Sequence, residues 1–223
     1  MKYKWLNKKN NPKIILFFNG WGMDENVVKH FDCEDYDVLM FYDYNTLETD
    51  FDWNLLNNYP KKNIIAWSMG VMVGNCLAPS LALPPGEGTK IAINGTLKPI
   101  DAEFGIHPKI YDLTIKGFNE KGRDRFIKSM FDEELTPHPS PLPKEREICE
   151  QHSELIALKE ICKLAPSLAL PLEEGKSVYN KILISDNDKI IPTKSQVAFW
   201  EIEPNLKGGH CPFFHFKKWS ELL

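Results

Sequence analysis

A serine stands where a buried strand is expected to turn into a helix. The apolar run Ile64–Trp67 leads into Ser68, Gly70 follows two positions later, and the helix-compatible stretch Met69–Leu77 begins at once. This order is typical of a nucleophile elbow, a tight turn that exposes the serine hydroxyl and directs a helix N-terminus toward developing negative charge. Serine with glycine two positions on also occurs by chance, but the strand and helix around it favour the elbow. Ser68 is therefore the candidate nucleophile.

A nucleophilic serine needs a base, and elbow enzymes carry their histidine late in the chain. His210 follows two glycines, Gly208 and Gly209, and precedes Cys211. A glycine-flanked loop suits a base that must move protons. His215 is the alternative, but it lies among three phenylalanines, which indicates packing. We therefore predict His210 as the base.

The acid of such a triad lies between the serine and the histidine in chain order. The predicted strand Tyr179–Ser185 ends in a loop that contains Asp186 and Asp188. Catalytic groups in open α/β sheets gather at the carboxyl ends of strands. Asp188, with the Lys189–Pro192 stretch after it, has the spacing common after a triad acid, whereas Asp186 is expected to cap the turn.

Two backbone N–H groups are candidates for an oxyanion hole. The first strand ends in the sequence FNGWG, in which Gly20 and Gly22 allow a sharp turn that directs the Trp21 amide into the site. The Met69 amide, directly after Ser68, is the second candidate donor. An ordinary turn after a strand has the same glycines, so the signal depends on Ser68 and His210.

Strands and helices alternate around these residues. Strands are expected at Ile14–Phe18, Tyr36–Tyr42, Asn63–Trp67, Lys90–Ile93 and Tyr179–Ser185. Helices are expected at Glu25–Phe31, Phe51–Asn58 and Met69–Leu77. Several strands are apolar on both faces, as buried parallel strands are. The expected fold class is α/β: an α/β-hydrolase fold with a mostly parallel central sheet, helices on both faces and a small helical cap.

Residues 97–177 interrupt this alternation within an expected single domain of residues 1–223. Two helices are predicted there, at Asn119–Phe131 and Glu147–Leu164. An excursion between two late strands leaves the sheet near its ligand-binding edge. We therefore predict that residues 97–177 form a cap over the active site.

Proline-rich pieces lie in and beside this insertion. The sequence LAPSLALP occurs at Leu77–Pro84 and again at Leu164–Pro171, and PHPSPLP occupies Pro137–Pro143. They lack the continuous periodic pattern of a solenoid repeat. Surface loops lengthen at small entropic cost. We expect surface insertions near residues 78–88, 137–147 and 165–175.

Composition excludes several classes of function. The formal net charge is −4, which argues against a nucleic-acid-binding protein, since such proteins need a broad basic face. No apolar run approaches a membrane span, and the lysine-rich start does not resemble a signal peptide. The five scattered cysteines indicate reduced thiols, hence a cytoplasmic protein. The isolated pair His30 and Cys33 lacks partners of metal-ligand spacing, so we expect no metal and no cofactor.

Taken together, these motifs resemble those of the pimeloyl-[acyl-carrier protein] methyl ester esterases of biotin synthesis, in the short branch of that activity. The matching motifs are FNGWG, WSMG at the elbow, INGT followed by KPID, the stretch Asp188–Pro192, and GGHCPF. The resemblance implies that Ser68 attacks the methyl ester of a carrier-bound pimeloyl group, with an acyl carrier protein as partner. The alternatives are a general carboxylesterase, an acyl thioesterase, or a hydrolase-fold binding protein without catalysis.

A basic stretch lies inside the predicted cap. Between Lys116 and Lys128 there are five basic residues against two acidic ones, although the whole chain is negative. Acyl carrier proteins are strongly acidic, so Arg123, Arg125 and Lys128 are candidate residues for binding the carrier. The alternative is a solvated helix face, which a run of charges usually is.

Overall fold

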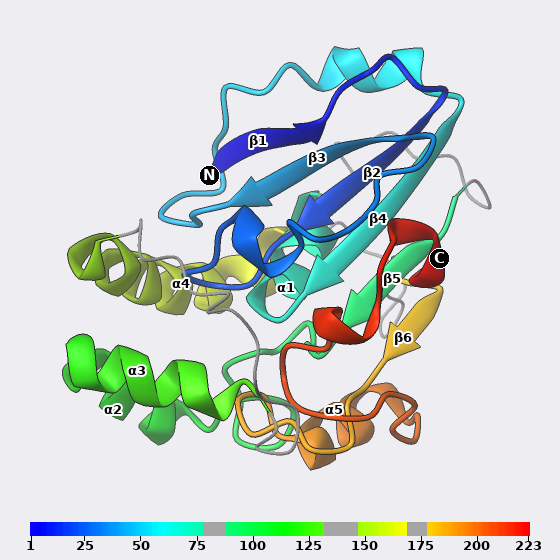
Figure 1. The fold of residues 1–223 in the computed structure, drawn as a ribbon. Coiled ribbons are helices and arrows are strands. Elements are labelled where there is room, and N and C mark those ends of the chain that lie inside the picture. The colour runs from blue at the N-terminus through cyan, green and yellow to red at the C-terminus, as the bar shows by residue number, and fades with distance from the viewer. Residues whose placement is uncertain (78–87, 132–146, 169–177) are drawn as a thin grey trace.

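The structure is a computed structural model that describes residues 1–77, 88–131, 147–168 and 178–223. Its centre is a six-stranded sheet in the order β1-β3-β2-β4-β5-β6 (Figure 1). The strands are β1 (Lys2–Asn7), β2 (Lys13–Phe18), β3 (Tyr36–Tyr42), β4 (Lys61–Trp67), β5 (Lys90–Ile93) and β6 (Lys181–Leu183). The edge strand β1 pairs antiparallel with β3, and every other pair is parallel. The predicted α/β-hydrolase class with a mostly parallel sheet is confirmed.

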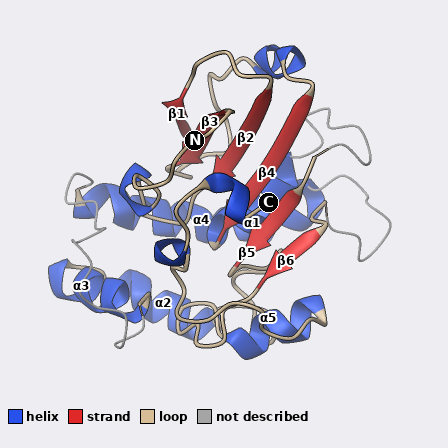
Figure 2. Cartoon of the chain, turned by 45° about the vertical axis from the view of Figure 1, so that its right-hand side comes forward, coloured by secondary structure: helices blue, strands red, loops and turns tan. Residues whose placement is uncertain are grey.

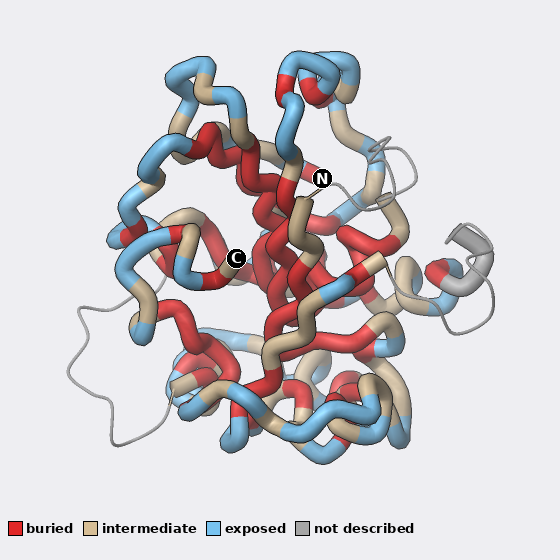
Figure 3. Tube along the Cα trace, turned by 90° about the vertical axis from the view of Figure 1, so that its right-hand side faces the viewer, coloured by how far each residue is buried: buried red, intermediate tan, exposed pale blue. Residues whose placement is uncertain are grey.

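Alternate strand residues pack on opposite faces of the sheet. Leu16, Phe18 and Phe41 face the helices α1 (Met69–Leu77) and α4 (Ile148–Leu168). Phe17 and Trp67 face the other way. That second face is covered by the C-terminal segment and by short 3-10 helices, η1 (Glu25–Val27), η5 (Phe213–His215) and η6 (Trp219–Glu221). The strands β2 to β5 are buried on both sides over most of their length, which explains their apolar sequences (Figure 3).

Three further helices lie at the carboxyl ends of the parallel strands (Figures 1 and 2). They are α2 (Pro108–Lys116), α3 (Glu120–Ser129) and α5 (Thr193–Trp200). Both α2 and α3 come from the segment predicted to form a cap, whereas α4 of the same segment packs beside α1 on the sheet. No helix in the described ranges combines the length and apolar composition of a membrane crossing.

Several predicted elements differ from the structure. The helix expected at Glu25–Phe31 is the three-residue η1, and that at Phe51–Asn58 is the 3-10 helix η2 (Trp53–Asn58). The strand β1 and the helices α2 and α5 were not predicted. Of the proline-rich insertions, residues 78–87, 132–146 and 169–177 lie outside the described residues. The second LAPSLALP copy was expected at the surface as a loop, but its first five residues, 164–168, continue α4 as a helix.

Candidate active site

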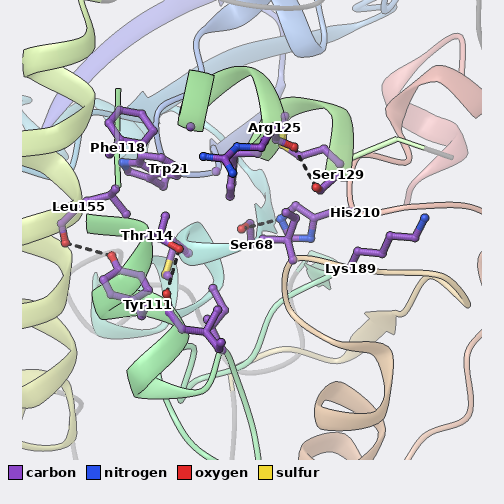
Figure 4. Close-up of a pocket in the computed structure, with 18 of the residues that line it drawn as sticks. Trp21, Ser68, Tyr111, Thr114, Phe118, Arg125, Ser129, Leu155, Lys189 and His210 are labelled. Atoms are coloured by element: carbon purple, nitrogen blue, oxygen red, sulfur yellow. Dashed lines mark hydrogen bonds between the residues drawn. The ribbon is translucent and has the colours of Figure 1, made fainter. Parts of the chain in front are cut away.

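Ser68 occupies the turn between β4 and α1. Its φ of +58° lies in the left-handed region, the strained conformation of a nucleophile elbow. The Ser68 N–H donates to the Ile93 carbonyl of β5 at 3.0 Å. Gly70 lets α1 approach β2, because a Cβ there would lie 2.3 Å from the Phe18 carbonyl oxygen. Sheet and helix thus fix the turn from both sides, and Ser68 lines a cavity (Figure 4).

The imidazole of His210 connects Ser68 with Asp188. Its Nε2 lies 2.8 Å from Ser68 Oγ, and its Nδ1 lies 2.7 Å from Asp188 Oδ2. All three residues are buried. Since an ionised carboxylate can only accept, Nδ1 carries the proton toward Asp188 and leaves Nε2 to accept from the serine hydroxyl. The structure thus brings the three predicted catalytic side chains into one hydrogen-bonded chain.

Asp188 is held by its own loop and by α5. Its Oδ1 accepts from the N–H groups of Ile190 at 2.8 Å and Ile191 at 3.1 Å. Its Oδ2 also accepts from Gln196 Nε2 at 2.8 Å. Both carboxylate oxygens of Asp188 therefore have hydrogen-bond donors besides His210, and these fix the orientation of the carboxylate. Sequence reasoning missed Gln196.

The backbone of His210 is anchored to β4 and to the end of β5. The His210 carbonyl accepts from Trp67 Nε1 at 2.8 Å and from Asn94 Nδ2 at 2.9 Å. Asn94 Nδ2 also donates to Ser185 Oγ at 2.7 Å. Asn94, the asparagine of INGT, therefore ties the histidine loop to the strand ends. The sequence marked INGT as a family motif without revealing this contact.

The two rival residues lie elsewhere. Asp186 accepts from the Gly208 N–H at 3.0 Å and pairs with Lys207 at 2.7 Å, as a turn-capping residue does. The hydrogen bond from Lys207 holds the pKa of Asp186 below its ordinary value. The expectation that His215 packs among phenylalanines is wrong, because His215 is exposed and only Phe213 of its aromatic neighbours is fully buried.

Two backbone N–H groups beside Ser68 are available to an oxyanion. Met69 is the first residue of α1, so its N–H has no acceptor within the helix. In the loop after β2, the N–H groups of Gly20 and Gly22 donate to side chains at 2.9 and 3.2 Å. The Trp21 N–H between them has no acceptor within the described residues. The predicted donors Trp21 and Met69 both line the cavity that contains Ser68.

The cavity has a volume of about 430 Å³, with Ser68 and His210 among its lining residues (Figure 4). Its walls are mostly apolar, from Trp21, Ile106, Tyr111, Phe118, Phe126, Met130 and Leu155. On α2, Ile110 and Leu113 are 55% and 62% exposed while lining the same cavity. An uncharged acyl chain is the ligand that such walls suit.

Basic side chains border the cavity. Arg125 of α3 is exposed and lines it, as does Lys189, directly after Asp188. Lys128 is exposed on α3 but is not a lining residue, and Arg123 is half-buried, with no hydrogen-bond partner for its Nε within the described residues. Of the three predicted carrier-binding residues, Arg125 lines the cavity and Arg123 and Lys128 do not. Lys189, which was not predicted as a binding residue, lines it as well.

Cys211 follows His210 but is a poor rival nucleophile. The residue is buried, and burial raises the pKa of its thiol to about 12, which keeps it protonated near neutral pH. Within the described residues, no group of three or more His, Cys, Asp or Glu side chains is placed to hold a metal ion. A serine hydroxyl hydrogen-bonded to an imidazole is an arrangement that can carry out acyl transfer.

The sheet, the serine turn and the hydrogen-bonded side chains are those of an α/β hydrolase. The same fold occurs in CarC, a serine hydrolase of carbazole degradation, with a TM-score of 0.53 and 13% identity over 93% of this chain and 86% of that one. The model of the family described as "Pimeloyl-ACP methyl esterase BioG" matches residues 1–222. The chain belongs to this family, which confirms the resemblance seen in the sequence.

Two relatives are similar to this chain over most of its length. The crystal structure of BioG from Haemophilus influenzae superimposes with a TM-score of 0.79 and 29% identity, over 100% of this chain and 99% of that one. A malonyl-[acyl-carrier protein] O-methyltransferase of Bacteroides fragilis is 36% identical over 196 residues, which are 85% of this chain. The chain spans only 36% of the length of that protein.

Proposed function

We propose that this protein hydrolyses the methyl ester of pimeloyl-acyl carrier protein to pimeloyl-acyl carrier protein and methanol, in biotin synthesis. Membership of the family supports the reaction. The observation that carries the proposal is the hydrogen-bonded chain from Ser68 through His210 to Asp188, beside an apolar cavity. Five free cysteines are in keeping with the cytoplasm as the place of this reaction.

In the first half of the reaction, Ser68 Oγ attacks the ester carbonyl while His210 Nε2 takes the hydroxyl proton. The negative charge that develops on the carbonyl oxygen is stabilised by the N–H groups of Trp21 and Met69. His210 then gives its proton to the departing methoxide, which leaves as methanol. Asp188 stabilises the imidazolium that forms between these two proton transfers.

In the second half, water replaces methanol. His210 takes a proton from the water as it attacks the acyl-serine carbonyl, and the same two N–H groups stabilise the second oxyanion. The proton returns to Ser68 Oγ, the acyl–oxygen bond breaks, and the carboxylic acid is released. No group other than these residues and water is required.

The cavity favours a methyl ester over a free acid. Its walls are mostly apolar, and an ionised carboxylate loses its hydration when it enters such a space. A methyl group removes that charge and lets the far end of the acyl chain reach Ser68. Hydrolysis restores the charge, which favours release of the product.

We propose that an acidic carrier docks at the mouth of this cavity, and that α2 and α3, within the segment 97–177 that was predicted as a cap, cover the site there. Arg125 and Lys189 supply positive charge at the cavity, and the exposed Ile110 and Leu113 supply apolar contact area. Lys128 extends the basic surface along α3. The name of the Bacteroides fragilis relative describes methylation of a carrier-bound acyl group, which makes the same class of ester.

The decisive experiment is mass spectrometry of methyl pimeloyl-carrier after incubation with the enzyme. Loss of the methyl group alone, with the acyl arm still on the carrier, is the expected result, and Ser68→Ala is the matched control. Release of the whole acyl group would instead identify an acyl thioesterase. Rapid hydrolysis of small p-nitrophenyl esters with an unchanged carrier substrate would identify a general carboxylesterase.

A further inference from the structure

The loop that contains the Trp21 amide is buried and is held at its start by the side chains of Asn19 and Tyr44. Asn19 is fully buried; its Oδ1 accepts from the Gly20 N–H at 2.9 Å, and its Nδ2 donates to the Asp24 carbonyl at 2.9 Å. Tyr44, after β3, donates its hydroxyl to the Asn19 carbonyl at 2.8 Å. These hydrogen bonds hold the loop at Asn19, Gly20 and Asp24, and none of them involves Gly22.

Helix α4 holds that second part of the loop. Gln151 Nε2 donates to the Gly22 carbonyl at 2.9 Å, and the Gln151 carbonyl accepts from Trp21 Nε1 at 3.0 Å. Glu154 Oε2 accepts from the Gly22 N–H at 3.2 Å. Both polar groups of Gly22, whose φ is +71°, are therefore bonded to one turn of α4.

Glu154 also binds a second loop. Its Oε1 accepts from the Tyr44 N–H at 2.9 Å, so one carboxylate connects the loop after β2 with the loop after β3. Glu154 is fully buried. Burying a carboxylate is costly unless it is hydrogen-bonded, and neither a shorter nor an apolar side chain would satisfy both N–H groups.

From these contacts we infer that Glu154, assisted by Gln151, is a positioning residue of the esterase: it directs the Trp21 N–H toward the oxyanion. Glu154 accepts from the N–H of Gly22, which lies in the peptide plane directly after Trp21. Holding this plane restricts the rotation of Trp21 and so fixes the direction of the Trp21 N–H. Oxyanion donors stabilise a transition state only if they are preorganised. This inference rests on the proposed serine mechanism.

The same turn of α4 also touches the substrate cavity. Leu155, the next residue, lines the cavity, and its carbonyl accepts from the Tyr111 hydroxyl of α2 at 3.0 Å. The oxyanion loop and the wall that faces the acyl chain therefore share one support. The kcat of a Glu154 variant therefore reports on the oxyanion loop, and its KM reports on the cavity wall to which Trp21 and Leu155 belong.

The test is Glu154→Gln, which keeps the volume and one acceptor but places an NH₂ group against a backbone N–H. We expect kcat on methyl pimeloyl-carrier to fall roughly 10- to 100-fold with KM changed less than about twofold. The inhibition constant of a trifluoromethyl ketone that mimics the tetrahedral intermediate should rise by the same factor. Glu150→Gln, exposed on the same helix, is the matched control and should leave all three values unchanged.

A second variant tests the inference if Glu154→Gln does not fold. Gln151→Met keeps the bulk but removes the donor to the Gly22 carbonyl, and it should give a smaller loss of the same kind. Two results would overturn the inference: unchanged kcat in both folded variants, or lost kcat with unchanged affinity for the ketone. If wild-type protein neither hydrolyses esters nor reacts with a fluorophosphonate, the proposed function itself fails.

Discussion

The carboxyl edge of the sheet and the face formed by α2 and α3 enclose one cavity, but they are built in opposite ways. At the sheet edge, Asp188 accepts hydrogen bonds from His210, Gln196 and two backbone N–H groups, and the whole assembly is buried. On the α2–α3 face, Ile110 and Leu113 are more than half exposed although they line the cavity.

Under the proposed function, this difference separates the residues that carry out the chemistry from those that recognise the carrier. Proton transfer requires donors and acceptors whose directions are set before the substrate arrives, and the sheet edge provides them. A surface for a partner remains exposed until the partner covers it. We therefore expect changes at the sheet edge to lower kcat, and changes on the α2–α3 face to raise KM for the carrier.

The largest effect should come from the acid of the triad. Asp188→Asn should lower kcat by roughly 10⁴-fold, because an amide in place of the carboxylate favours the wrong imidazole tautomer. Asp186→Asn should stay within about threefold, since Asp186 only caps a turn and pairs with exposed Lys207. Steady-state kinetics of both variants checks this, and the reverse order would move the acid to Asp186.

A smaller effect is expected on the α2–α3 face. Arg125→Glu should raise KM for methyl pimeloyl-carrier about tenfold, more at low salt, because it opposes an acidic partner. Hydrolysis of a small free methyl ester should stay unchanged. Lys9→Glu, an equal charge change on an exposed loop before β2, is the control. Equal losses on both substrates would indicate a disturbed cavity and no docking role.

The smallest effect concerns the thiols. The pKa of Cys211 is raised to about 12 by burial, so almost no thiolate exists at pH 7.5, despite its place next to His210. Iodoacetamide at that pH should label the exposed Cys149 and leave activity intact. Inactivation that follows alkylation of Cys211 would show that the histidine loop opens far more than its hydrogen bonds suggest.

Local patterns account for what could be predicted from the sequence. The strand, Ser68, Gly70 and the following helix lie within one short stretch, so their relation is visible without the fold. The glycines before His210 are also local, and the order serine, acid, histidine can be read along the chain without knowing any contact. By contrast, Asn94 and Glu154 were missed because their partners lie 116 and 110 residues away along the chain.

Two missed elements have physical reasons of their own. Helix α2 starts at Pro108 after His107, whose ring nitrogen accepts from the Lys109 N–H at 3.2 Å, and histidine is not among the usual N-cap residues. Strand β1 alternates lysines with Tyr3 and Trp5. Because the lysines make its sequence polar, the partly buried face was not recognised as a strand. Strand β1 depends on its pairing with β3, and helix α2 depends on its packing against α4.

The central claim is that Ser68 is the nucleophile that His210 activates. A fluorophosphonate should form one adduct per chain, and peptide mapping by mass spectrometry should place it on Ser68. Ser68→Ala should give no adduct, and methyl pimeloyl-carrier should slow labelling of the wild-type protein. An adduct on another residue, or an active enzyme that the reagent does not modify, would contradict the account.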